Sequence, residues 1–306
     1  MFKIGVLFLT TLCYLSSGAL SRAADPDFRS IKADLKVPPL VEENIGPGIR
    51  TKIRSNEYQN EIYHVLYLPK DWKPHKKFPV IVEYSGNGPY HDRNGDISTG
   101  LVEGSKLGYG LSGGVGYIWL CLPYLNSKGT ENVRKWWGDA PNYDPIPTVE
   151  YCKRTVKSVC HKFGGDQKRI ILCGFSRGAI ACNFIGLYDD EISKLWAGFI
   201  PYSHYDGVKK WVYPGSDRVS AIKRMSRLAG RPQLILSESF KSNQLTKKYI
   251  KSSAGNGQFT FMETGFRNHN DEWVLRPSHT RKLLVLGLRR LCQFHNTNRG
   301  SLFLFP

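Results

Sequence analysis

The sequence predicts an α/β fold with a mostly parallel central sheet, antiparallel strands near its N-terminus and helices on both faces. Three observations support this prediction. The second half of the chain alternates short apolar segments with longer amphipathic ones, a pattern typical of parallel strands joined by right-handed crossover helices. The chain has 306 residues, of which 41% are hydrophobic, so it can bury a large core. A Gly-x-Ser-x-Gly pentapeptide, Gly174–Gly178, stands where a predicted strand meets a predicted helix.

The N-terminal residues 1–24 have the features of an export signal. Lys3 precedes the apolar run Ile4–Leu15, and small residues suited to cleavage follow that run. The run is too short to span a bilayer stably. We therefore expect a secreted or periplasmic protein without a membrane span. Residues 25–47, rich in proline and charge, are expected to form an extended lead-in, and residues 48–306 to form the α/β domain.

The first half of the domain contains four predicted strands and one long helix. The strands are short β-branched or alternating segments, Ile49–Ile53, Glu61–Leu68, Phe78–Tyr84 and Val115–Leu122. The helix Pro147–Phe163 carries proline in its first turn and is followed by two glycines, which favour a start and a stop there.

The second half is predicted to continue as strands and helices in turn. Ile170–Cys173 is too short for a helix and leads into the pentapeptide. The remaining predicted strands are Trp196–Ser203, Gln233–Leu236 and Phe259–Glu263. The remaining predicted helices are Ala179–Leu187, Asp217–Ala229, Asn243–Lys251 and the basic amphipathic Pro277–Phe294.

Ser176 is the candidate nucleophile. A strand, a sharp turn and a helix are the setting that a nucleophile elbow requires, because the turn lifts the serine to the end of the sheet. Gly174 and Gly178 would relieve the crowding of such a turn. The alternative is an ordinary strand-to-helix turn in which Ser176 caps the helix.

Four chemically capable residues follow the ends of parallel strands and should therefore meet at one edge of the sheet. They are Ser176, Asp206, Glu238 and His269. A serine hydroxyl needs a base to take its proton and a carboxylate to orient that base. His269 follows the last strand, where the base belongs in the order serine, acid, histidine. Glu238 and Asp206 are both placed to be the acid, and the sequence leaves this choice open.

An oxyanion hole needs two N–H donors near the serine. The backbone of Arg177, directly after Ser176, is one candidate. The second is Asn87 or Gly88, because glycines after the strand Phe78–Tyr84 let the backbone approach a substrate oxygen. The long loop between Pro123 and Pro145 carries Trp136 and Trp137, which could stack on a substrate sugar or anchor the loop.

The charge and cysteine content limit the partners. The formal net charge is +17, which favours either an acidic polysaccharide partner or a basic surface spread over many helices. No nucleic-acid-binding motif accompanies this charge, so nucleic acid is not expected. Seven cysteines include one in the export signal. The others are spaced as neither a zinc site nor an evident disulfide framework, and no metal or cofactor is expected.

The strand Phe78–Tyr84 with Gly86-Asn87-Gly88, the segment Arg169–Gly178 and the late His269 together resemble the α/β-hydrolase superfamily. More narrowly, they resemble its exported esterases of the feruloyl, acetylxylan and polyhydroxybutyrate-depolymerase type. The resemblance covers roughly residues 61–294. It implies a serine carboxylesterase that acts through an acyl-enzyme on small or carbohydrate-linked esters. A serine peptidase of the same fold and a non-catalytic polyanion- or carbohydrate-binding protein are the alternatives.

Overall fold

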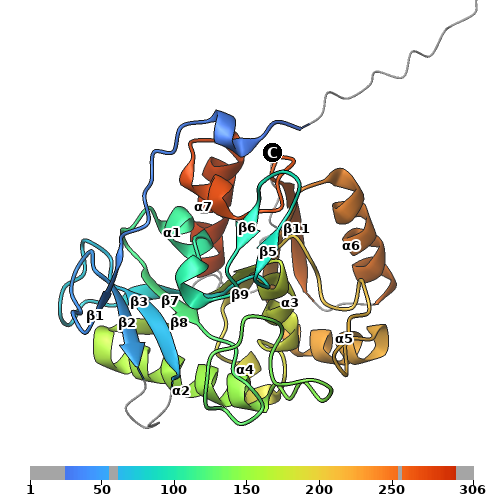
Figure 1. Cartoon of the computed structure of the whole chain (residues 1–306), viewed down its shortest axis with the longest axis horizontal. Helices are drawn as coiled ribbons and strands as arrows, with labels where there is room; N and C mark the ends of the chain where they lie inside the picture. Colours follow the sequence, from blue (N-terminus) through green and yellow to red (C-terminus); the bar gives the residue numbers. More distant parts are fainter. Residues whose placement is uncertain (1–24, 55–60, 254–256, 294–306) are drawn as a thin grey trace, which may run out of the picture.

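The computed structural model describes residues 25–54, 61–253 and 257–293 (Figure 1). The expected export signal, residues 1–24, lies outside these ranges. Across the described part of the chain, no helix combines the length and the apolar composition needed to cross a membrane.

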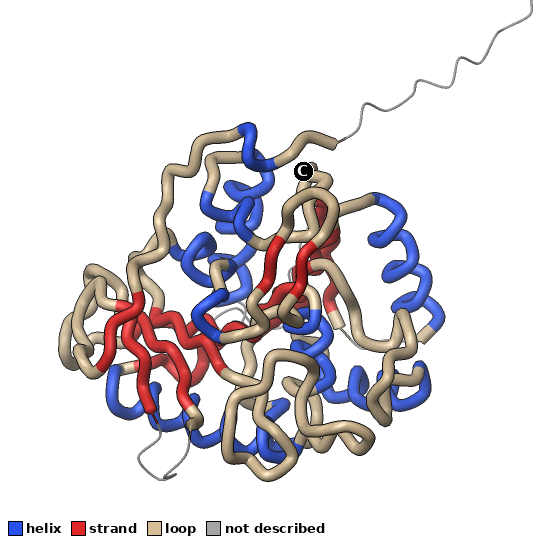
Figure 2. The backbone as a smooth tube through the Cα atoms, in the orientation of Figure 1, coloured by secondary structure: helices blue, strands red, loops and turns tan. Residues whose placement is uncertain are grey.

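A nine-stranded sheet forms the centre of the molecule, with strand order β1-β2-β3-β7-β4-β8-β9-β10-β11 (Figure 2). Strand β3 is antiparallel to its neighbours β2 and β7, and all other pairs are parallel. The strands are Leu40–Glu42 (β1), Arg50–Arg54 (β2), Tyr63–Tyr67 (β3), Phe78–Tyr84 (β4), Ile118–Leu122 (β7), Gly165–Phe175 (β8), Gly198–Tyr202 (β9), Pro232–Ser237 (β10) and Gln258–Glu263 (β11). The predicted fold class is confirmed.

Helices cover both faces of this sheet and enclose two hydrophobic cores (Figure 1). One core joins the sheet to α2, α3, α5 and α6, and the other joins it to α1 and α7. The helices are Leu107–Ser112 (α1), Ile146–Phe163 (α2), Arg177–Phe184 (α3), Asp190–Ser193 (α4), Arg218–Met225 (α5), Phe240–Ser252 (α6) and His279–Gln293 (α7).

Shorter elements complete the described chain. A small hairpin of Tyr90–His91 (β5) and Ile97–Ser98 (β6) projects from the loop after β4. The 3-10 turns are Phe28–Ser30 (η1), Val102–Gly104 (η2), Ser226–Leu228 (η3) and Glu272–Leu275 (η4). The hairpin, η2 and α1 follow one another between β4 and β7, and residues of β6, η2 and the turn before α1 line one cavity together with Ser85 and Gly86 after β4.

Strand β4 is a buried strand that contains one charged residue, Glu83. All seven residues are buried, which explains their nearly continuous apolar character. The exception is Glu83, whose carboxylate accepts hydrogen bonds from the backbone of Leu107 and Gly108 and from the indole of Trp119. The carboxylate therefore satisfies free N–H groups in the first turn of α1 and fixes that helix against the sheet.

The expectation of an extended lead-in over residues 25–47 is only partly right. Leu40–Glu42 pairs in parallel with β2 and forms the edge of the sheet. Phe28 is fully buried and packs edge-on against Phe266. The lead-in is therefore part of the folded body, because its few apolar residues reach the core on the α7 side.

Candidate active site

The turn at Ser176 has the backbone of a nucleophile elbow. Ser176 has φ 54° and ψ −112°, a conformation that a residue with a side chain rarely adopts. The flanking glycines make the turn possible. A Cβ on Gly178 would lie 2.0 Å from the carbonyl oxygen of Tyr84, and one on Gly174 would lie 2.4 Å from the backbone of Gly178. No other residue type fits either position without moving the backbone.

Ser176, His269 and Glu238 meet at the carboxyl edge of the sheet, although they come from three separate loops. Glu238 Oε1 lies 2.8 Å from His269 Nδ1, and Ser176 Oγ lies 3.2 Å from Nε2. An ionised carboxylate only accepts, so Nδ1 carries the proton and donates it to Glu238. Nε2 is then the acceptor for the Ser176 hydroxyl, the arrangement needed for a general base.

Asp206, the alternative acid, lies elsewhere. Its carboxylate is buried and accepts two hydrogen bonds from the Arg224 guanidinium, at 2.9 and 3.1 Å. Arg224 also donates to the carbonyl oxygen of Gly215. The interpretation of Asp206 as the acid beside His269 is therefore corrected: this buried ion pair ties α5 to the loop after β9.

The imidazole of His269 is held between aromatic rings. Its centroid lies 4.7 Å from the ring of Phe175, 5.5 Å from Tyr90 and 5.4 Å from His204. Ser203 Oγ lies 3.2 Å from Nδ1, beside the hydrogen bond to Glu238. Ser203 itself has φ 90°, a strained conformation for a residue with a side chain.

The electrostatics of this cluster favour a charged acid. Burial alone would raise the pKa of Glu238, but the hydrogen bond and charge of His269 hold it below its ordinary value. Burial, reinforced by the neighbouring His269, lowers the pKa of His204 to about 4. Glu238 is thus ionised at neutral pH while His204 stays uncharged, which leaves His269 as the histidine paired with a carboxylate.

The two loop candidates for the oxyanion hole differ in their bonding. The backbone N–H of Gly88 donates to the carbonyl oxygen of Arg134 at 2.9 Å, and a Cβ on Gly88 would lie 2.1 Å from Thr99. Gly88 is therefore a packing residue, and its interpretation as an oxyanion donor is wrong. The Asn87 side chain accepts from the Trp136 backbone, whereas its own N–H has no acceptor among the described residues.

Both the backbone and the side chain of Arg177 lie next to Ser176 and the loops around it. Its N–H lies in the first turn of α3, where backbone donors lack acceptors within the helix. Its guanidinium is buried and donates to the carbonyl oxygens of Trp136 (2.7 Å), Gly86 (2.9 Å) and Gly100 (3.0 Å). It also lies 3.7 Å above the ring of Tyr124. Sequence reasoning gave a role to the Arg177 backbone alone.

The two tryptophans have different surroundings. Trp137 is fully buried and stacks on Phe184 at 4.5 Å, so its interpretation as a substrate-binding residue is wrong. Trp136 is half-buried, with its ring 5.1 Å from Trp211 and 4.9 Å from Tyr213. Trp211 in turn lies 5.5 Å from the ring of His204. Trp136 therefore belongs to an aromatic cluster that continues through His204 to His269.

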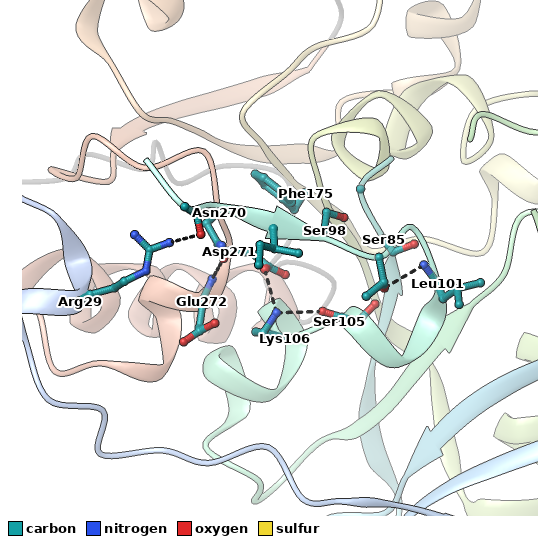
Figure 3. Close-up of a pocket in the computed structure, with 15 residues that line it drawn as sticks. Arg29, Ser85, Ser98, Leu101, Ser105, Lys106, Phe175, Asn270, Asp271 and Glu272 are labelled. Atoms are coloured by element: carbon teal, nitrogen blue, oxygen red, sulfur yellow. Dashed lines mark hydrogen bonds and ion pairs between the residues drawn. The ribbon is translucent and has the colours of Figure 1, made fainter. Parts of the chain in front are cut away.

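A cavity of about 310 Å³ opens beside the elbow (Figure 3). Its lining includes Gly86 from the loop after β4, Phe175 before Ser176, and Asn270 after His269. The rest of the lining combines hydroxyl groups and apolar side chains with the charged groups of Arg29, Lys106, Asp271 and Glu272, and Lys106 is 3.9 Å from the carboxylate of Asp271. The end of β8 and the loops after β4 and β11 thus each contribute a residue to this cavity.

Three residues near His269, namely Asp96, Tyr90 and Ser203, were not among the candidates from sequence. Asp96 accepts the backbone N–H of His269, and Tyr90 contacts its ring, yet neither follows a predicted strand. Ser203 did carry a signal, since it ends the predicted strand Trp196–Ser203 at the same edge as His269. Among the described residues, no group of three or more histidine, cysteine or acidic side chains is arranged to hold a metal ion.

Comparison with known proteins identifies the fold. No family model matches the chain. The chain is 30% identical over 138 residues to the cAMP-regulated D2 protein of Dictyostelium discoideum, a match that covers 45% of this chain and 23% of that protein. The chain therefore spans less than a quarter of that protein's length.

Solved structures give a wider match. S-formylglutathione hydrolase from Agrobacterium tumefaciens superposes with a TM-score of 0.54 at 15% identity, over 82% of this chain and 97% of that chain. A candidate dipeptidyl aminopeptidase IV from Bacteroides ovatus gives 0.54 at 15% identity, over 79% of this chain and 35% of that chain. With the sheet order above, these matches show that the chain has the α/β-hydrolase fold.

Proposed function

We propose that the protein is a serine esterase that forms an acyl-enzyme on Ser176. The observation that carries the proposal is the continuous contact from Glu238 through His269 to Ser176, at 2.8 and 3.2 Å, on a strained elbow. The proposal extends to an exported enzyme, since residues 1–24 have the composition of an export signal.

The reaction follows from the positions of these groups. Ser176 Oγ attacks the ester carbonyl carbon while His269 Nε2 takes the hydroxyl proton, and Glu238 stabilises the imidazolium that forms. Nε2 then gives the proton to the alkoxide oxygen as the bond to the acyl carbon breaks. Water repeats the same steps against the acyl-enzyme, which releases the acid and restores Ser176. No cofactor takes part in this scheme.

The oxyanion of each tetrahedral intermediate would be bound by two backbone donors, those of Arg177 and Asn87. The Arg177 N–H follows the nucleophile directly, and the Asn87 N–H is unused by the described residues. Gly86, just before Asn87, would carry a Cβ only 3.4 Å from the Cβ of Ser176, so this loop lies within reach of the nucleophile. Such preorganised donors contribute about 3–4 kcal/mol each to catalysis.

The cavity beside Phe175 and Gly86 is proposed to hold the acyl group. Its volume of about 310 Å³ is at the lower end for ligand cavities, and its lining mixes hydroxyls and apolar side chains with charged groups at Arg29, Lys106, Asp271 and Glu272. This favours a short acyl group. The half-buried Trp136 and the aromatic cluster with Trp211 would then face the alcohol portion, where an aromatic ring can stack on a sugar.

Reaction with a fluorophosphonate probe tests the proposal. We expect the wild-type protein to be labelled at Ser176 and to hydrolyse p-nitrophenyl acetate and butyrate faster than the octanoate. Ser176→Ala should abolish both labelling and turnover while leaving the unfolding midpoint nearly unchanged. Absence of labelling in the wild type would favour the alternative of a non-catalytic polyanion- or carbohydrate-binding protein.

The same enzyme preparation separates an esterase from a peptidase. We expect an aminoacyl p-nitroanilide to be hydrolysed far more slowly than the acetate ester. Comparable kcat/KM values for the two substrates would contradict the esterase proposal and support a peptidase instead.

A further inference from the structure

We propose that Asp96 is a positioning residue for His269 and that the N-terminal segment 26–29 acts with it. This inference rests on the proposed function, because it assigns His269 the role of the base. It concerns the backbone of that histidine, whereas Glu238 acts on the ring.

Asp96 lies at the end of the hairpin turn between β5 and β6 and is fully buried. Its Oδ2 accepts the backbone N–H of His269 at 2.9 Å. Its Oδ1 accepts the guanidinium of Arg29 at 2.7 Å and the side-chain amide of Asn268 at 3.1 Å. The carboxylate thus binds two successive residues of the loop that carries the base.

The buried charge of Asp96 depends on Arg29. An ionised carboxylate without a partner is costly in a protein interior, and Arg29 supplies the opposite charge from the N-terminal segment. Arg29 also donates to the carbonyl oxygens of Asn94 and Gly95, on the turn that presents Asp96. One arginine therefore fixes both the charge and the orientation of this turn.

The rest of the N-terminal segment contacts the same loop. The backbone N–H of Arg267 donates to Pro26 O at 3.2 Å, and that of Phe28 donates to Asn268 Oδ1 at 3.1 Å. The carboxylate of Asp27 accepts from Asn268 and from the Arg267 guanidinium. Segment 26–29 and Asp96 therefore hold residues 267–269 through independent hydrogen bonds.

The hairpin of β5 and β6 also restricts the position of the His269 imidazole. Tyr90, at its first strand, meets the His269 ring edge-on at 5.5 Å, and the Asp92 carboxylate accepts the backbone N–H of Asp96 at 2.9 Å. A shift of Asp96 would therefore move both the backbone and one wall of the ring. Because the Nε2 to Oγ distance is 3.2 Å, a small displacement would break the contact needed for proton transfer.

The test compares Asp96→Ala, Asp96→Asn and Arg29→Ala by kcat per active site, with sites counted by fluorophosphonate titration. We expect Asp96→Ala to lower kcat by roughly 10–100-fold with little change in KM, as a misplaced base does. Asp96→Asn keeps one acceptor oxygen and should recover part of that loss. Arg29→Ala should fall between Asp96→Asn and the wild type. The hydrogen-exchange rate of the peptide containing residues 267–269 should rise from the wild type through Arg29→Ala and Asp96→Asn to Asp96→Ala.

Asp34→Ala is the matched control, because it removes an acidic partner of Arg281 from the same N-terminal region without touching the His269 loop. A purely structural role predicts fewer titratable sites at unchanged kcat per site, and that result would overturn the proposal. If Asp96→Ala does not fold, unchanged kcat per site in both Asp96→Asn and Arg29→Ala would overturn it equally. Labelling of the wild type, lost in Ser176→Ala, tests the proposed function separately.

Discussion

Two acidic side chains follow neighbouring strands at the same edge of the sheet, and their partners set their roles. Glu238 faces an imidazole that can exchange a proton with Ser176. Asp206 faces Arg224, whose guanidinium stays charged and cannot relay a proton. The sequence placed both at one edge but could not choose between them, because the partner of Asp206 comes from a helix 18 residues later.

Substitution of each acid by its amide should separate these roles. Glu238→Gln should lower kcat by roughly 10³–10⁴-fold with little loss of stability, since the amide favours the wrong imidazole tautomer.

Asp206→Asn should destabilise the fold by about 3–5 kcal/mol, because it leaves Arg224 buried without its charge partner, yet keep kcat per titrated site. Urea unfolding and titrated kcat values check both. A large fall of kcat per site in Asp206→Asn would contradict this assignment.

At the scale of elements, the long loop after β7 carries two adjacent tryptophans with different surroundings. Trp137 is buried in the core, whereas Trp136 is half-buried. Trp137 fills the core between the loop and α3, whereas the Trp136 backbone joins Asn87 and Arg177. A paired aromatic motif predicts both roles but does not say which residue takes which. Burial separates them: Trp137 is fully buried and Trp136 is half-buried, although their rings meet edge-on at 6.0 Å.

Alanine substitutions should reveal this division. Trp137→Ala should lower the free energy of unfolding by about 3–5 kcal/mol, as expected for a fully buried large side chain. Trp136→Ala should cost less stability and raise KM for a sugar ester several-fold more than KM for p-nitrophenyl acetate. Trp72→Ala, a half-buried tryptophan bonded to the end of α2, is the control. Equal KM changes for the two esters would contradict a sugar-stacking role for Trp136.

Local patterns predicted most of the strands and helices but missed contacts made between distant segments. The strand Phe78–Tyr84 was predicted to the residue, because a buried parallel strand has a continuous apolar sequence. The role of Asp96 was invisible, because its partners Arg29 and His269 are 67 and 173 residues away. The burial of Phe28 in the expected lead-in could not be predicted either, because a single aromatic residue has no periodicity from which burial could be read.

At the scale of the whole molecule, the formal net charge of +17 leads us to propose a charge-driven attraction to polyanions. We expect the protein to be retained on immobilised polygalacturonate at low salt and released at roughly 0.3–0.5 M sodium chloride, where screening shortens the reach of surface charges. An uncharged polysaccharide matrix is the control. Retention that does not depend on salt, or equal retention on both matrices, would contradict a charge-driven partner.

The buried guanidinium of Arg177 joins backbone oxygens from three different loops next to the nucleophile. Those loops cannot shift one at a time without breaking a hydrogen bond to a charged group, so they should move together or stay still. An inhibitor bonded to Ser176 would then reduce the motion of the Trp136 loop and of the residues around Gly100 together, even where it touches neither of them.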